Sequence, residues 1–154
     1  MKRILLAAML LLFVCNGACA QYFENVLERY AAEKKADVVD VPQSMMKVAR
    51  LFVSGRERQL FKMIESMSIL SLKDCGKDVK ERFLEEMREC EPQGYESALH
   101  VGKKGITSRV FAKKSNEDGV AYEMVVASVE NRGDVALMIM NGKFNLAEVV
   151  EIFK

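Results

Sequence analysis

Residues 106–140 read ITSRVFAKK, SNEDG, VAYEMVVASV, ENRGD and VALMIM, and this stretch decides the fold. The first, third and fifth segments are rich in β-branched and aromatic residues, as strands are. The two segments between them supply the Gly, Asn and Asp that turns require. Just upstream, Gly102 and Gly105 bracket a hairpin turn after a strand that starts at Glu96. The pattern therefore predicts an antiparallel β-meander of four strands.

Residues 37–72 predict a second unit. Asp37 to Val41 is a short strand that Pro42 ends, and an apolar helix over residues 45–52 follows. A shorter helix runs from Glu57 to about Ile64, with Ser54 and Glu57 at capping-box spacing. Residues 67–72 then form a strand, so this β-helix-helix-β unit is compatible with a crossover connection.

Three further helices are predicted over residues 22–35, 77–89 and 145–153. Their apolar residues repeat at intervals of three and four. Asp78 and Asn145 are the expected N-caps, each with a Glu three residues on. Asn141-Gly142 is read as a turn after the last strand. The fold class is thus α+β: an antiparallel four-stranded β-meander extended by an N-terminal β-helix-helix-β unit, with helices packed on the sheet.

The N-terminus has the three parts of a secretory signal peptide: a basic head, an apolar run over residues 4–15 and the small-residue site Ala18-Cys19-Ala20. The apolar run is shorter than the roughly 20 residues that span a bilayer. We expect residues 1–20 to be a signal peptide and residues 21–154 to be a single α+β domain. Lipidation at Cys19 is the alternative to cleavage after Ala20, because Gly17 and Ala18 precede it.

Composition and cysteine use narrow the function classes. The net charge is +1, with acids and bases interspersed, so no nucleic-acid footprint is indicated. Cleavage leaves Cys75 and Cys90, an even pair that an oxidising compartment would join. However, a helix over residues 77–89 would hold them about 20 Å apart, beyond the reach of a disulfide. Separate free thiols are the expected state.

No catalytic or cofactor motif is visible. His100 is the only histidine, and it lies beside a hairpin turn without a nucleophile at a known spacing. Glu85-Glu86 point apart on their helix, so they make a poor acid–base pair. We therefore expect a protein that is not an enzyme and that carries no cofactor.

Methionines offer the one metal hypothesis. The chain beyond residue 20 has many of them, and thioethers are soft ligands for Cu(I). Met138 and Met140 share one face of their predicted strand and are the weak copper candidates. The same residues also suit an irregular apolar core, which is the preferred interpretation.

The last strands are apolar on both faces, which a sheet open to water on one side would not show. On one face we place the candidate ligand or partner residues Val120, Tyr122, Met124, Val126, Met138 and Met140. The cover for this second face is either the chain's own helices, a partner chain such as a second copy, or an apolar ligand. A cross-strand ion pair between Arg109 and Glu123 is also expected, from a five-residue loop between their strands.

Several segments together resemble one family: ACA before Gln21, PQSMMKVARLF at 42–52, FKMIESMSILSL at 61–72, Gly94-Tyr95-Glu96, YEMVVASV at 122–129 and NGKFNLAEVVEIF at 141–153. The chain resembles the small exported proteins of domain-of-unknown-function family 4252, found mainly in Bacteroidetes. That resemblance implies a periplasmic or outer-membrane-associated protein, in some members a lipoprotein or a secreted one. It also implies an accessory role in envelope-stress regulation, with an unknown envelope partner. The family brings no established activity, so no catalytic residue is carried over.

Overall fold

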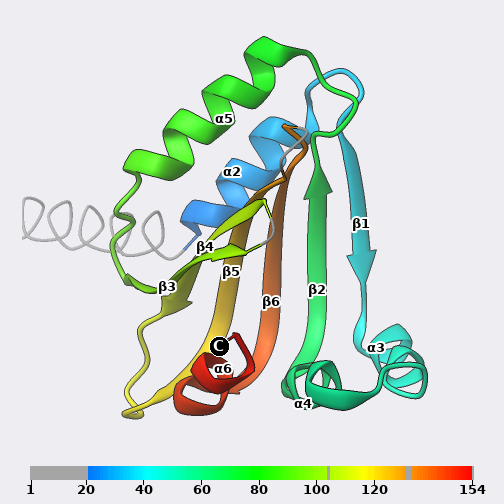
Figure 1. The fold of residues 1–154 in the computed structure, drawn as a ribbon, viewed down its shortest axis with the longest axis vertical. Coiled ribbons are helices and arrows are strands. Elements are labelled where there is room, and N and C mark those ends of the chain that lie inside the picture. The colour runs from blue at the N-terminus through cyan, green and yellow to red at the C-terminus, as the bar shows by residue number, and fades with distance from the viewer. Residues whose placement is uncertain (1–20, 104, 131–132, 154) are drawn as a thin grey trace, which may run out of the picture.

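The computed structural model describes residues 21–103, 105–130 and 133–153, which form an α+β fold around one six-stranded antiparallel sheet (Figure 1). The strand order is β1-β2-β6-β5-β4-β3, and every neighbouring pair is antiparallel. The elements in chain order are α2 (Tyr22–Ala31), β1 (Asp37–Val41), α3 (Gln43–Ala49), α4 (Gly55–Met63), β2 (Ile64–Ser71), α5 (Lys77–Glu89), β3 (Tyr95–Lys103), β4 (Ile106–Lys113), β5 (Val120–Glu130), β6 (Val135–Asn145) and α6 (Leu146–Phe153).

The β-helix-helix-β unit joins the same sheet, which makes the sheet wider than the predicted meander. β1 and β2 are direct antiparallel neighbours, with Val39 opposite Ile69, so a crossover connection is wrong. The reason is visible in Figure 1: α3 and α4 both lie at the same end of the strands, and the chain turns back there. β2 then pairs with β6, with Leu70 opposite Leu137, and links the unit to the rest of the sheet.

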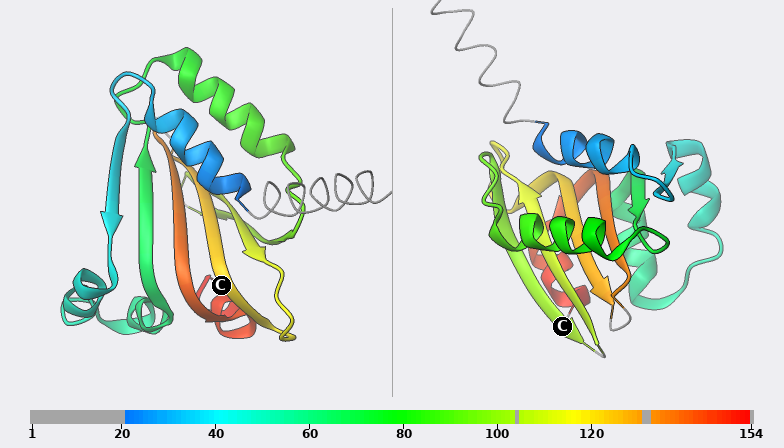
Figure 2. Two further views of the ribbon diagram at one scale, coloured as in Figure 1. Left: turned by 180° about the vertical axis from the view of Figure 1, so that it is seen from behind. Right: turned by 90° about the horizontal axis from the view of Figure 1, so that it is seen from above.

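Helices α2 and α5 cover one face of the sheet, as the view from behind in Figure 2 shows. Each buries one stripe at helical spacing, which is why these segments form helices against an apolar sheet. Phe23 stacks near Tyr95 and Phe111, with ring centroids 4.9 and 5.0 Å away. The buried stripes are Phe23, Val26 and Tyr30 in α2 and Val79, Phe83 and Met87 in α5.

A second cluster fills the opposite face near one end of the strands. There α3 contributes Met46 and α6 contributes Val149, packed against Ile64, Met124, Met140 and Phe144. The expected cap of α6 is confirmed, because the Asn145 side-chain oxygen accepts hydrogen bonds from the backbone N–H groups of Ala147 and Glu148. These helices cover only the lower end of the face in Figure 1.

Two local predictions are wrong and a third is only partly right. Gly76, not Asp78, is the N-cap of α5. Ser54 is the N-cap of α4, as its spacing predicts, but its side chain makes no capping hydrogen bond. Asn141-Gly142 is not a turn: β6 continues to Asn145, and Gly142 lies opposite Ile64. A Cβ added at Gly142 would lie 1.9 Å from the Met63 carbonyl oxygen, so a glycine is needed where the backbone of β6 passes close to that of Met63.

The predicted pair of Arg109 and Glu123 is also wrong, because the connection between β4 and β5 is longer than five residues. Ala112 pairs with Met124, which places Arg109 opposite Ala127. Arg109 instead donates hydrogen bonds to the carbonyl oxygens of Met87 and Arg88, at 2.9 and 3.1 Å. The guanidinium thereby satisfies backbone acceptors at the C-terminal end of α5.

Cys75 and Cys90 are free thiols in the structure, as expected from the helix between them. Cys75 is buried and Cys90 is half-buried. Burial raises the pKa of both thiols, which lowers their reactivity. Residues 1–20, which include Cys19 and the predicted signal peptide, lie outside the described residues.

Candidate interaction surface

The face that carries α3, α4 and α6 is built from three rows of side chains that cross the strands. Cross-strand partners in an antiparallel sheet lie on the same face, so the register defines the rows. The first row, nearest the helices, is Val41, Met67, Met140, Met124 and Ala112. The second is Val39, Ile69, Met138, Val126 and Val110; the third is Asp37, Ser71, Ala136, Ser128 and Ser108.

Burial falls from the first row to the second on β1, β6 and β5, whereas on β4 both Ala112 and Val110 are fully buried and on β2 both Met67 and Ile69 are half-buried. Met124 and Met140 are 0% and 2% exposed. Ile69, Met138 and Val126 are only half-buried, and Val39 is 49% exposed. We call these four residues of the second row the open strip. None of the helices within the described parts of the chain covers the open strip, because all three on this face lie at its lower end (Figure 1).

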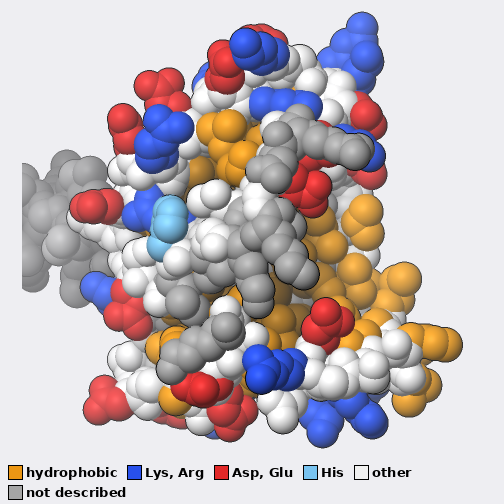
Figure 3. All heavy atoms as spheres, in the orientation of Figure 1, with side chains coloured by type: hydrophobic (Ala, Val, Ile, Leu, Met, Phe, Trp, Pro, Cys, Tyr) orange, Lys and Arg blue, Asp and Glu red, His pale blue; other side chains and the backbone are white. Residues whose placement is uncertain are grey.

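The surface view shows the same feature from outside. In Figure 3, hydrophobic side chains gather over β1 and β2 and continue down to α3. Beyond the open strip, the third row consists of small side chains, Ser71, Ala136, Ser128 and Ser108, after Asp37 at the edge. A hollow of about 190 Å³ lies along this row, lined in part by Ser71, Ser128 and Ala136. Small side chains beside an apolar strip let another backbone approach the sheet closely.

The structure brings together only part of the predicted ligand face. Val126 and Met138 lie on the open strip, whereas Met124 and Met140 are core residues. Tyr122 does not share their face. The register shifts between Ala121 and Glu123, so Ala121 packs in the cluster of Met124 instead. Such a bulge reverses the alternation of the strand beyond it.

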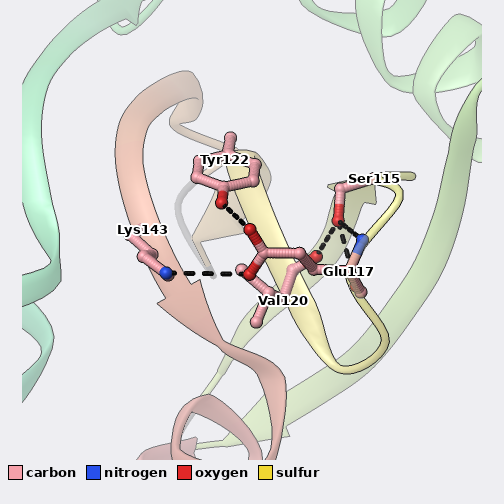
Figure 4. A network of polar contacts seen from close by, with 5 residues as sticks. All are labelled: Ser115, Glu117, Val120, Tyr122 and Lys143. Atoms are coloured by element: carbon pink, nitrogen blue, oxygen red, sulfur yellow. Dashed lines mark hydrogen bonds and ion pairs between the residues drawn. The ribbon is translucent and has the colours of Figure 1, made fainter.

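Tyr122 belongs to a polar network at the start of β5, drawn in Figure 4. Its hydroxyl donates a hydrogen bond to Glu117, and the other carboxylate oxygen of Glu117 lies 3.6 Å from the Lys143 Nζ. These two partners lower the pKa of the Glu117 carboxyl. Val120, which is half-buried, accepts a hydrogen bond from Ser115 through its carbonyl oxygen. This network orders the loop before β5 and has no apolar binding surface.

A buried polar cluster lies on the other face of the sheet, beneath the start of α2. Glu123 is 5% exposed and accepts a hydrogen bond from the Tyr95 hydroxyl, and its second oxygen lies 3.4 Å from the Lys113 Nζ. One oxygen of Glu24 is buried without a hydrogen-bond partner among the described residues. Burial, and secondarily the nearby Glu123, raises the pKa of Glu24. Burial and the bond to Glu123 raise the pKa of Tyr95.

The sequence did not indicate this cluster, because its members come from four separate elements, α2, β3, β4 and β5. Two acids close together with a raised pKa are what carboxylate chemistry would need. However, Glu123 is already held by a hydroxyl and an ammonium, and neither acid lines any of the cavities described below. These contacts therefore indicate a role in stabilising the fold rather than in catalysis.

An apolar cavity lies between α5 and the sheet, away from the open strip. Its volume is about 290 Å³, and its walls are Phe83, Leu84 and Met87 of α5 with Ala127 and Val129 of β5. His100, Arg88 and Arg109 stand at its rim. This is at the small end of the range for ligand pockets.

The methionines concentrate on the face of the open strip. Met67, Met140 and Met124 are successive cross-strand partners on β2, β6 and β5, and Met138 is next to this row. Within the described ranges no group of His, Cys, Asp or Glu could hold a metal ion. The thioethers are thus the soft donors that the face offers, and their burial also fits core packing.

Sequence reasoning missed the exposure of α3 and the turn after it. Residues 45–52 were predicted only as an apolar helix, and among their apolar side chains only Met46 is fully buried. Met45, Val48, Leu51 and Phe52 are 57%, 56%, 79% and 83% exposed. Apolar side chains cover most of this helix, with Lys47 and Arg50 confined to one side, so the spacing does not show which of the apolar residues face water. No helix in the described part of the chain has the length and apolar character to cross a membrane.

Comparison with known proteins identifies one family. The family described as Domain of unknown function (DUF4252) matches residues 30–152, which is most of the chain, so the chain belongs to it. No curated protein matches the sequence. No solved structure matches it either.

Proposed function

For this member of the DUF4252 family, we propose an exported, non-enzymatic interaction module of the cell envelope that binds a protein partner through the open strip. The observation that carries the proposal is the uncovered row Val39, Ile69, Met138 and Val126. These four adjoining apolar side chains are half-buried or, at Val39, exposed, beside a mostly polar third row and a first row in which Met124 and Met140 are buried. Contiguous exposed apolar surface of this kind is typical of interaction sites.

The shape of the surface favours a protein over a small apolar ligand. A small ligand is held by a concave site that surrounds most of its surface. The open strip is part of a sheet face, and the apolar cavity under α5 lies on the opposite face. A partner segment laid across β1, β2, β6 and β5 would cover the strip and fill the space above Ser71 and Ala136.

Site-specific photo-crosslinking tests the proposal. Two variants are expressed in the cells that make the protein. The first has a photoreactive amino acid in place of Ile69. The second, the matched control, has it in place of the exposed Glu85 on α5. We expect a discrete crosslinked protein from position 69 and none from position 85. Adding Met138→Asp to the first variant should abolish the product. A crosslinked product that persists in the presence of Met138→Asp would contradict the proposal. A product of twice the chain mass would identify the partner as a second copy of the chain.

A second candidate function is Cu(I) binding by the methionine row. It rests on the alignment of Met67, Met140 and Met124 across three adjacent strands, which brings three thioethers together. Titration with Cu(I) against a chelator tests it, with Met140→Leu as the variant and Met87→Leu, in the other core, as the control. Binding lost only in Met140→Leu supports this function; no binding by the unchanged chain rejects it.

A further inference from the structure

We propose that the turn after α3 is a lipid-docking tip that inserts into a bilayer surface carrying anionic lipids. The tip is formed by Met45, Val48, Leu51 and Phe52, together with the cations around them. It lies beyond the open strip, at the far end of the molecule, and this inference does not rest on the proposed function.

The tip is one side of a continuous helical turn. Backbone bonds from Leu51 N–H to the Val48 carbonyl and from Phe52 N–H to the Ala49 carbonyl extend α3 by almost one turn. At 3.6 residues per turn, Met45, Val48, Leu51 and Phe52 then fall on one side, and Met46 falls on the opposite side. Met46 is 0% exposed, whereas Leu51 and Phe52 are 79% and 83% exposed. The segment is thus anchored by one apolar side and presents another to the outside.

Arg50 fixes this presentation. Its Nε donates a hydrogen bond to the Phe61 carbonyl oxygen at 3.0 Å, and its Nη2 donates one to the Ile64 carbonyl oxygen. These bonds tie the end of α3 to the junction of α4 and β2. Leu51 and Phe52 are therefore held away from the core, and the tip needs little reordering to insert.

Charge decides which kind of surface the tip fits. Residues 43–63 carry five cations and one carboxylate, while the whole chain has a net charge of only +1. Lys47, Arg56, Arg58 and Lys62 are exposed, and α4 buries none of its side chains. The neighbouring hollow between α3, α4 and α6 adds one further cation, Lys143, and three acids, Glu65, Glu148 and Glu151, so it reduces this excess but leaves it positive.

Bulky exposed apolar side chains next to exposed cations in the same segment match an anionic bilayer surface. The apolar groups enter the boundary between headgroups and acyl chains, and the cations meet the lipid phosphates. A protein partner for the same tip would instead need an acidic rim around an apolar socket, and it is the alternative outcome of the test.

The absence of tryptophan from the chain allows a direct test. Phe52→Trp introduces a single reporter at the tip, and Val39→Trp introduces a matched one on the open strip. The protein as purified from cells is mixed with vesicles of phosphatidylcholine containing about one third phosphatidylglycerol. We expect a blue shift of the emission for Phe52→Trp and none for Val39→Trp, with vesicles of phosphatidylcholine alone giving a much weaker response.

Two sets of variants sharpen the result. Lys47→Gln and Arg58→Gln, made in the Phe52→Trp protein, should each weaken vesicle binding about fivefold, while Lys73→Gln, at the other end of the sheet, should not. Leu51→Ser should weaken it at least as much. The proposal is overturned if Phe52→Trp gives no shift with anionic vesicles, if neutral vesicles bind equally well, or if the shift appears only with a protein fraction of the envelope.

Discussion

Ile69 of β2 lies directly opposite Met138 of β6, and both side chains are half-buried on a sheet face that the described helices leave open. The next residues along the same strands, Leu70 and Leu137, also pair with each other, but they are 0% exposed under α2 and α5. The same two strands thus carry one apolar pair that is fully buried in the core and one apolar pair that folding leaves partly exposed.

Substitutions in these two pairs should separate stability from binding. Leu70→Ala or Leu137→Ala should lower the free energy of unfolding by about 2–5 kcal/mol, because each leaves a cavity in the core. Ile69→Thr or Met138→Thr should change it by less than about 1 kcal/mol, since both sites are partly solvated and threonine suits a strand. Urea unfolding measures the difference. Equal losses at both pairs would mean that the open strip is ordinary core.

Arg109 should stabilise the C-terminal end of α5. Its Nη1 bonds to the carbonyl oxygens of Met87 and Arg88, and its guanidinium lies 4.6 Å from the centroid of the Phe111 ring. Arg109→Met should cost about 1–3 kcal/mol, because two carbonyl groups lose a charged donor. Hydrogen exchange should rise in the last turn of α5 and stay unchanged in α2. Uniform exchange across both helices would contradict a local role for Arg109.

The buried Glu123 should depend on both of its partners. Tyr95→Phe removes the hydroxyl that donates to one carboxylate oxygen, and Lys113→Met removes the ammonium near the other. Each change should destabilise the fold by about 1–3 kcal/mol, since a buried carboxylate loses a donor. In a double-mutant cycle, Tyr95→Phe and Lys113→Met should each cost clearly less stability in a Glu123→Gln background than in the unchanged protein. Additive losses of unfolding free energy would show that Tyr95 and Lys113 do not act through Glu123.

Glu24 should make the fold less stable as the pH rises. Burial raises the pKa of its carboxyl above that of the unfolded chain, so the folded state binds the proton more tightly. Stability should therefore fall as the pH rises from the usual carboxyl pKa through the raised one. Glu24→Gln should remove this loss, so the variant gains stability relative to the parent between about pH 4 and neutral pH. Parallel stability curves for the two proteins would rule out the effect.

The sequence predicted the strands better than their pairing. β-Branched runs and Gly-rich breaks located β4, β5 and the start of β6, and helical spacing located α2 and α5. The registers depended on features with no local signal. The bulge between Ala121 and Glu123 turned Tyr122 off the predicted face. Asn141-Gly142 has turn chemistry, but Gly142 is needed where the Met63 backbone passes close by.

The candidate site was likewise predicted only in part. Apolarity on both faces of β5 and β6 correctly indicated Val126 and Met138 as side chains on a second face. The sequence could not show that α3, α4 and α6 gather at one end of that face, because helix placement depends on long-range packing. Nor could it place Val39 and Ile69 on the same strip, since this requires the pairing of β1, β2 and β6.

Native mass spectrometry of the protein recovered from the cells that make it tests the open strip most directly. The unchanged chain and the Met138→Asp variant are compared under the same mild conditions. We predict that the unchanged chain carries a second polypeptide and that Met138→Asp is recovered as a bare monomer that still melts cooperatively. The same bare monomer for both proteins, or the same bound partner on both, would contradict a protein-binding role for this face.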